Sequence, residues 1–180
     1  YLAGYTSNTN YCTYVGAYAG QLATGQYNTA IGDAALYSSG AGTDNTAVGS
    51  SAMPNNTSGS YNTGIGRYAL ASNTTGGSDT AVGYAAAYSN TTGAYITAVG
   101  YPALYTNTTA NYSTAICYTA LKSTTTGYST AVGFQAGTGN TTGGISAFGL
   151  NVLNANTTGD ANCAFGGSTP AGWSASMQNN

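Results

Sequence analysis

A five-residue pattern, typified by the NTAVG of Asn45–Gly49, recurs along almost the whole chain and limits how the chain can fold. Ten copies fill residues 12–166, and successive copies begin 16 or 17 residues apart. The complete unit reads N-T-A-V-G-Y-x-A-L-Y-x-N-T-T-G-x-Y, and we number its positions 1–17, so that Thr46 stands at position 2. A unit this short cannot bury its own apolar side chains, so neighbouring units must stack to share a core.

The unit indicates β-structure, because Gly and β-branched residues are poor helix formers. We predict two short strands in each unit, x-T-A-V-G and Y-x-A-L-Y, with a turn at N-T-T-G. Stacked units then form an all-β fold, a parallel β-solenoid (β-roll) of about ten 16–17-residue coils, roughly 50 Å long at about 4.8 Å per coil. Residues 1–166 are the predicted repeat domain. Residues 167–180, which include Pro170 and Trp173, are a C-terminal cap or a connector, and we favour the connector.

Two positions of the unit are expected to build the core. Position 4 is Val, Ile or Phe in every copy, and position 9 is mostly Leu or Met. Stacking would place each of these side chains on its counterparts, with the Ala of position 8 where opposite walls come close together. The predicted core residues are Val15, Ile31, Val48, Ile65, Val82, Val99, Ile116, Val132, Phe148, Phe165, Leu36, Leu70, Leu104 and Leu121.

The Thr of position 2 leaves two interpretations open. Residues two apart on a strand share a face, so Thr would follow position 4 into the interior, which is the interpretation that we favour. Outward Thr side chains would instead form a regular array with about 4.8 Å between coils, as on several ice-binding proteins. The direction of these side chains therefore decides between an internal ladder and an external binding face.

The chain is almost uncharged, which argues against several classes of function. Two basic residues, four acidic residues and no histidine leave 3% of the chain charged, against about 25% in a typical domain. Nucleic-acid binding needs a basic patch, and acid–base or nucleophilic catalysis needs groups that the chain lacks. The four Asp residues fall at different positions of the unit and form no metal cage. We expect no enzyme activity, catalytic residue, cofactor, metal site or nucleic-acid partner.

The cysteines and the hydropathy pattern add two further expectations. Cys12 and Cys163 lie nine coils apart, about 43 Å at the same spacing, which is beyond the reach of a disulfide. Together with Cys117 they are expected to be free thiols that act as small apolar fillers. The chain contains no run of about 18 apolar residues, so we predict no membrane span.

Sequons of the form N-x-[ST] recur in the N-T-T-G turn and can be interpreted in two ways. They are favourable turn chemistry, since Asn tolerates left-handed backbone, and we favour this interpretation. In a glycosylating secretory route they could instead carry a line of sugars along one edge. The candidate glycan sites are Asn73, Asn90, Asn107, Asn140 and Asn156.

Tyrosines also fall into columns, at positions 6 and 10 of the unit. A Tyr ring is apolar and its hydroxyl is polar, so such columns suit exposed stacking platforms or contacts between chains. The candidate contact residues are Tyr37, Tyr88, Tyr105, Tyr84, Tyr101 and Tyr118.

The x-x-A-[VI]-G cores and the N-T-T-G turns resemble two groups of repeat proteins. One is the head repeats of YadA-like trimeric autotransporter adhesins, which read roughly S-V-A-I-G-x-x-A-x-A, and the other is the NTAVG-type arrays of phage tail-fibre and related surface proteins. The resemblance covers about residues 3–166. It implies a left-handed parallel β-roll, three chains side by side, and tight packing of the position 3 residues Ala30, Ala47, Ala81 and Ala98.

The unit differs from the adhesin unit in two ways, because it is longer and because Thr replaces the first apolar residue of the strand. Trimerisation is therefore implied by the resemblance alone. We expect a non-catalytic structural or adhesive segment of an extracellular fibre on a cell surface or virion, such as a tail fibre, a surface adhesin or a filament subunit. Its expected partners are copies of itself, as a trimer or filament, and cell-surface glycans. The alternative is an ice-binding β-solenoid that uses the Thr array.

Overall fold

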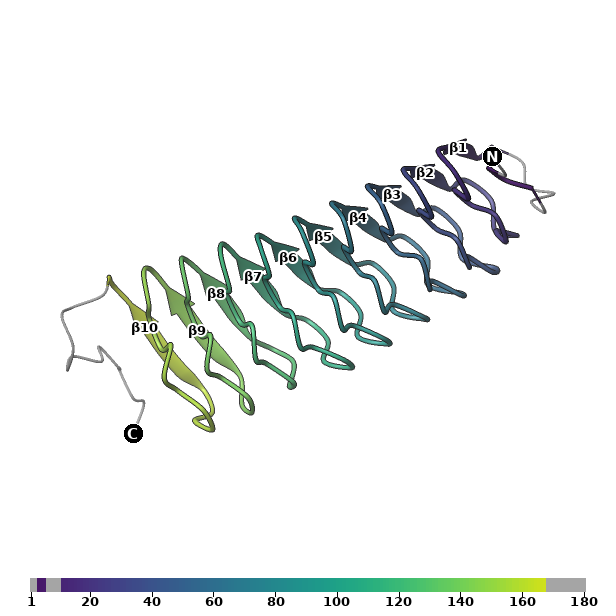
Figure 1. Cartoon of the computed structure of the whole chain (residues 1–180). Helices are drawn as coiled ribbons and strands as arrows, with labels where there is room; N and C mark the ends of the chain where they lie inside the picture. Colours follow the sequence, from purple (N-terminus) through teal and green to yellow (C-terminus); the bar gives the residue numbers. More distant parts are fainter. Residues whose placement is uncertain (1–2, 6–10, 168–180) are drawn as a thin grey trace.

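The computed structural model describes residues 3–5 and 11–167. These residues form an all-β solenoid in which short parallel strands stack along one axis as a rod (Figure 1). The described part of the chain contains no helix. The ten strands of the described residues are β1 (Thr13–Val15), β2 (Thr29–Ile31), β3 (Thr46–Val48), β4 (Thr63–Ile65), β5 (Thr80–Val82), β6 (Thr97–Val99), β7 (Thr114–Ile116), β8 (Thr130–Val132), β9 (Ile145–Phe148) and β10 (Asn162–Phe165).

The strands form one sheet in which every strand pairs in parallel with the next strand of the chain. The register aligns equivalent positions of the repeat, so that Thr29 lies beside Thr46 and Ala30 beside Ala47. The same alignment holds from β1 to β10, also where a coil has 16 residues instead of 17. The predicted parallel β-solenoid is therefore confirmed, with one strand for each copy of the repeat.

The second predicted strand, Y-x-A-L-Y, does not form. Positions 7 and 9 adopt left-handed backbone, as in Ala34 (φ 52°) and Leu36 (φ 49°), which a β-strand does not permit. The segment still joins neighbouring coils, because the Leu36 N–H donates to the Ala52 carbonyl at 3.0 Å and the Ala34 N–H to the Ala17 carbonyl at 2.8 Å. Each coil thus has one strand of three or four residues and a hydrogen-bonded series of turns.

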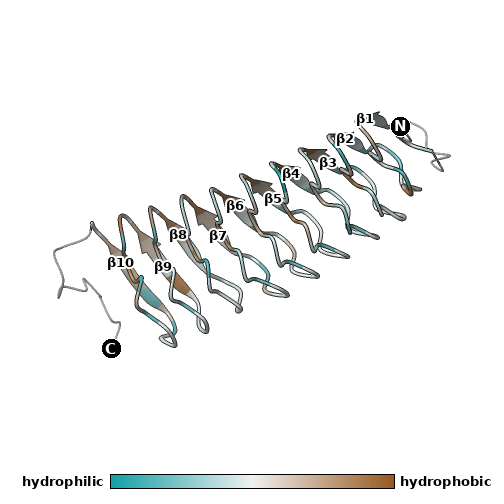
Figure 2. Cartoon of the chain, viewed as in Figure 1, coloured by the Kyte–Doolittle hydropathy of each residue, from teal (hydrophilic) through white to brown (hydrophobic). Residues whose placement is uncertain are grey.

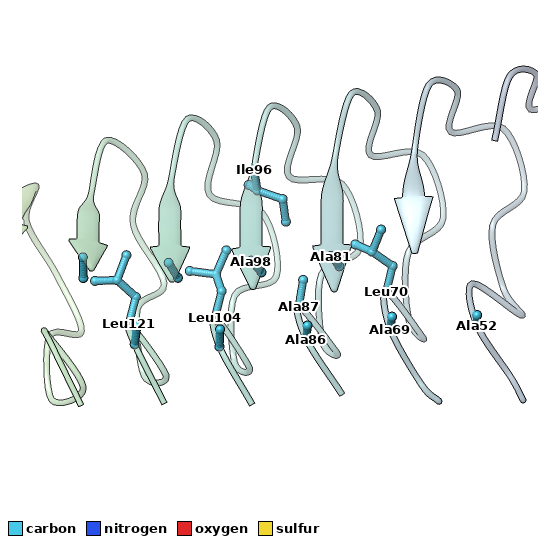
Figure 3. Packing of buried hydrophobic residues seen from close by; sticks show 14 of the residues in the cluster. Ala52, Ala69, Leu70, Ala81, Ala86, Ala87, Ile96, Ala98, Leu104 and Leu121 are labelled. Carbon is cyan, nitrogen blue, oxygen red and sulfur yellow. The ribbon is translucent and has the colours of Figure 1, made fainter. Parts of the chain in front are cut away.

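The core is narrow and consists largely of alanine. Position 3 of the strand and position 8 of the opposite wall are Ala in most coils, and these side chains are buried. Position 9 fills the space between the walls with larger side chains (Figure 3). The fully buried members of position 9 are Leu36, Met53, Leu70, Leu104 and Leu121.

The expectation that position 4 faces the interior is wrong. The sheet alternates in the order out, in, out, and the small Ala of position 3 takes the inner place, because the opposite wall is close. Positions 2 and 4 do share a face, but it is the outer one. The most exposed members of position 4 retain 37% to 62% of their accessible surface. The position 4 residues, all partly or largely exposed, are Val15, Ile31, Val48, Ile65, Val82, Val99, Ile116, Val132, Phe148 and Phe165.

Figure 2 shows hydrophobic colour on many strands and hydrophilic to neutral colour over much of the turns. Part of the strand colour belongs to the outward side chains of position 4, which lie on the surface of the isolated chain. The predicted cap or connector, residues 167–180, lies outside the described residues except for Gly167.

Buried asparagines form a polar ladder at position 12 beside this apolar core. The Asn73 side-chain amide donates to the Asn56 carbonyl oxygen at 2.9 Å, Asn90 donates to Asn73 at 3.1 Å, and Asn107 donates to Asn90 at 3.1 Å. Each amide also caps its own turn, as Asn90 does by donating to the Gly93 carbonyl at 2.9 Å. These bonds satisfy groups that would each cost about 1–3 kcal/mol if buried without a partner.

A second ladder occupies position 1. The Asn28 Oδ1 atom accepts the Asn45 backbone N–H at 2.9 Å, and the Asn45 Oδ1 atom accepts the Asn62 N–H at 3.0 Å. Their Nδ2 atoms donate to position 15 carbonyls of the same coil, as from Asn28 to Gly42 at 2.8 Å. Cys12 begins this ladder, since its Sγ atom accepts the Asn28 N–H at 3.3 Å.

Candidate functional surfaces

The outer face of the sheet carries two parallel columns of side chains, which we call the strand face. One column is the Thr of position 2 and the other is the Val, Ile or Phe of position 4. Neighbours along a column are about 4.8 Å apart, and the two columns are about 6.6 Å apart, at two residues along a strand. Thr at position 2 repeats from β1 to β8 without a gap, and its members are Thr13, Thr29, Thr46, Thr63, Thr80, Thr97, Thr114 and Thr130.

The Thr side chains therefore point away from the core, contrary to the interpretation that the sequence favoured. From β2 to β8 they are partly exposed, and in β1 Thr13 is exposed. The strand face combines hydroxyls, methyl groups and branched apolar side chains, and position 2 is Ser146 in β9 and Cys163 in β10. Such a face can pack against an apolar surface or order a layer of water, and the described part of the chain offers nothing that covers it.

The predicted tyrosine columns lie on the surface, and many rings contact the ring of the next coil. At position 6, Tyr84 and Tyr101 meet edge-on with centroids 5.3 Å apart, and Tyr118 stacks on Phe134 at 5.1 Å. At position 10, Tyr88 and Tyr105 stack at 5.2 Å. The position 10 rings are partly buried, whereas Tyr84, Tyr101 and Tyr118 are 41% to 50% exposed. Tyr37 stands apart from these contacts and meets Tyr18 edge-on at 6.5 Å.

A third tyrosine column, at position 17, was not singled out from the sequence. Tyr95 stacks on Tyr112 at 5.1 Å and Tyr112 stacks on Tyr128 at 5.4 Å, and all three rings are more than half exposed. Their backbones are left-handed, with φ of 59°, 56° and 63°. The final Tyr of the repeat unit is the signal that could have revealed this column, because it recurs in the same phase in most coils.

The candidate glycan sites are not accessible surface residues. Asn73, Asn90, Asn107 and Asn140 are fully buried, and Asn156 is partly buried. Glycosylation would use the side-chain nitrogen, which in each of them donates hydrogen bonds inside the turn. The N-T-T-G turn therefore uses Asn as an internal hydrogen-bonding group, which agrees with the turn interpretation that the sequence favoured over a line of sugars.

The acidic side chains are dispersed along the rod. Asp33, Asp44 and Asp160 are exposed, whereas Asp79 is fully buried at position 1, in the place of an asparagine. Burial raises the pKa of the Asp79 carboxyl from 3.8 to about 7, and a hydrogen bond from the Ile96 backbone opposes part of this rise. Within residues 3–5 and 11–167, no three His, Cys, Asp or Glu side chains gather in a way that could hold a metal ion.

Cys117 is an exposed thiol, whereas Cys12 and Cys163 are partly buried. No helix in the described part of the chain is long and apolar enough to span a membrane. No protein-family model, curated protein or solved structure matches the chain. The strand face and the tyrosine columns are the candidate functional surfaces of the chain.

Proposed function

We propose that the chain is a non-catalytic structural or adhesive segment of an extracellular fibre on a cell surface or virion. In this proposal the stacked coils supply length, and copies of the chain associate along the strand face as a trimer or filament. The exposed column of position 4 is the observation that carries the proposal, because apolar side chains aligned along a whole rod are typical of an interaction surface. The resemblance to adhesin and tail-fibre repeats agrees with this function.

The size of the strand face explains why such a segment would be repeated many times. Nine steps of about 4.8 Å give a length of about 43 Å, and a three-residue strand is about 10 Å wide. One copy can therefore contribute roughly 430 Å², about half of the roughly 800 Å² per partner in a stable standard interface. Each added coil enlarges the face by about 48 Å², so association would strengthen with the length of the array.

The proposal is tested by the mass of the full chain in solution over a range of concentrations, measured by analytical ultracentrifugation. We expect a reversible rise toward a trimer or a longer assembly. The double variant Val48→Lys, Val82→Lys puts two charges on the strand face and should weaken association at least tenfold, because each charge would be desolvated on contact. The control Tyr95→Lys puts a charge on another exposed surface and should associate like the unaltered chain. A monomer at every concentration would refute the proposal.

Ice binding is a second candidate, favoured by the outward direction of the Thr column. Eight consecutive Thr residues stand in register on a flat parallel sheet, with methyl and hydroxyl groups at a regular spacing. A surface with this regularity can hold water in an ordered lattice, and the near absence of charge leaves that layer undisturbed.

Both candidates use the strand face, so the experiment must separate them. A monomer that lowers the freezing point without lowering the melting point of ice would favour ice binding. Thr80→Tyr should then abolish the effect, because a bulky ring interrupts the flat array. Thr92→Tyr is the matched control, since Thr92 is exposed in a turn away from the sheet. An assembled chain without this activity would exclude ice binding.

A further inference from the structure

The tyrosine column of position 17 has a gap where one coil lacks that residue. In the copy that starts at Ser129, Gly144 is followed directly by Ile145 at position 1 of the next copy. Gly144 lacks the left-handed backbone with which Tyr128 and Ala161 end their copies, so the residue of position 17 is the one that is missing. Tyr128 stands on one side of the gap, and Ala161 stands at the same position two coils away. The structure has a hollow of about 280 Å³ here, lined by these four residues together with neighbouring polar side chains. We call this hollow the column gap.

The column gap has the dimensions of one flat ring. In the intact column Tyr112 stacks on Tyr95 at 5.1 Å and on Tyr128 at 5.4 Å, so each coil contributes one ring. Two coil spacings, about 9.6 Å, separate the residues on the two sides of the gap. Tyr128 contacts Tyr112 with one face of its ring, and no other described aromatic ring stacks on it. Its exposure of 77% reflects this open side.

A fixed carboxylate stands at the edge of the gap. The Asp160 Oδ1 atom accepts the Gly144 N–H at 2.7 Å and the Ala161 N–H at 2.9 Å. These two bonds orient the carboxylate. Its second oxygen accepts no hydrogen bond from the residues that the structure describes, so it can accept one from a hydroxyl group of a ligand. Ser146 and Asn162 also line the hollow, and no Lys or Arg does.

We propose that the column gap binds one neutral pyranose ring of a glycan. The apolar face of the sugar would stack on Tyr128, and a sugar hydroxyl would donate to the Asp160 carboxylate. An acidic sugar would be repelled by Asp160, with no cation among the lining residues to compensate. A purely aromatic ring would fit the space but would offer no donor to the second oxygen of the carboxylate. The site does not depend on assembly of the rod.

Backbone amide NMR of the full chain tests the site with four methyl glycosides, those of glucose, galactose, mannose and N-acetylglucosamine. We expect saturable shifts of the Gly144 and Ala161 amides with at least one glycoside, because both amides donate to Asp160. Binding should be in the millimolar range, as expected for one exposed ring contact and one or two hydrogen bonds. Tyr128→Ala should weaken it about tenfold, whereas Tyr128→Phe should retain most of it.

Insertion of one Tyr between Gly144 and Ile145 tests the site most directly, because it fills the gap. It restores the 17-residue coil and places a ring in the gap, so binding should be lost while the circular dichroism spectrum is retained. Tyr95→Ala, at the end of the stacked run that lies farthest from the gap, should bind like the unaltered chain. The proposal is overturned if none of the four glycosides shifts these amides, if the filled variant still binds, or if p-cresol saturates the gap while the glycosides do not.

Discussion

Asp79 stands at the end of the asparagine ladder of position 1, and replacing it with Asn should stabilise the rod at neutral and alkaline pH. At the equivalent position Asn62 donates its side-chain N–H to the Gly76 carbonyl at 2.9 Å. Asp79 accepts instead at both oxygens, from the Ile96 backbone at 3.1 Å and from the Asn90 amide at 3.2 Å. The ionised carboxylate thus has no proton for the turn that the other ladder members cap.

The size of the effect follows from the shift in the pKa of Asp79, from 3.8 to about 7. Because folding raises this pKa, the folded state favours the protonated acid, and stability is greatest below pH 3.8. Stability falls as the pH rises from 3.8 to 7 and is constant above that range. A shift of about 3 units at 1.36 kcal/mol per unit corresponds to about 4 kcal/mol, fully lost by about pH 8.

Urea unfolding followed by circular dichroism at pH 4 and pH 8 measures this loss. Asp79→Asn should be more stable than the unaltered chain by about 4 kcal/mol at pH 8 and by little at pH 4. Hydrogen exchange of the Ile96 amide gives a local reading, since that N–H donates to Asp79. Asp33→Asn, which also replaces one carboxyl but at an exposed place, is the matched control. If Asp79→Asn is no more stable at pH 8, or keeps the same pH profile, the reasoning about the buried acid fails.

Three further predictions test the internal organisation by urea unfolding. Asn90→Ala should lower the free energy of unfolding by about 3 kcal/mol, because the Gly93 carbonyl and the Asn73 oxygen lose a buried donor. The exposed control Thr92→Ala should lower it by less than about 0.5 kcal/mol. Equal losses would show that the Asn ladder does not stabilise the fold. Leu104→Ala should lower the free energy of unfolding by about 3 kcal/mol and Val99→Ala by about 1 kcal/mol or less, since only Leu104 is fully buried. The reverse order would mean that position 4 belongs to the core. Cys117→Gly should stabilise the chain by about 1 kcal/mol, because Cys117 holds a φ of 109° where the other coils have Gly, and a loss of stability would show that the thiol contributes packing.

The register of the solenoid could be predicted because it depends only on repetition. Ten copies of nearly constant length must place equivalent residues side by side if their backbones are to pair, so the alignment of Thr46 with Thr63 follows from the sequence. The turns between positions 6 and 11 could not be predicted by the same reasoning. Left-handed backbone at Leu70 and at its counterparts is uncommon for large side chains, and only the hydrogen bonds between coils make it favourable here.

The direction of each strand residue could not be predicted from alternation alone. Alternation places Thr46 and Val48 on one face and Ala47 on the other, but it does not say which face is inside. Hydrophobicity favours Val inside, whereas the structure buries Ala47 and leaves Val48 partly exposed. The deciding quantity is the separation of the walls, which the length of the coil and its turns set together. The repeated Ala at positions 3 and 8 was the available signal for close walls.

The alanine core determines which side chains lie on the surface of the rod. Small side chains at positions 3 and 8 bring the two walls close together, and the Val and Ile residues of position 4 lie on the surface of the rod, where they can meet a partner. The polar ladders at Asn45 and Asn73 then contribute to stability, because hydrogen bonds between equivalent Asn residues of successive coils specify register where alanines alone would allow slippage. The outward T-x-V pattern of Thr46 and Val48 is therefore a product of the same narrow section that requires Ala47 between them, and changing Ala47 to Val should perturb the strand face by forcing the walls apart.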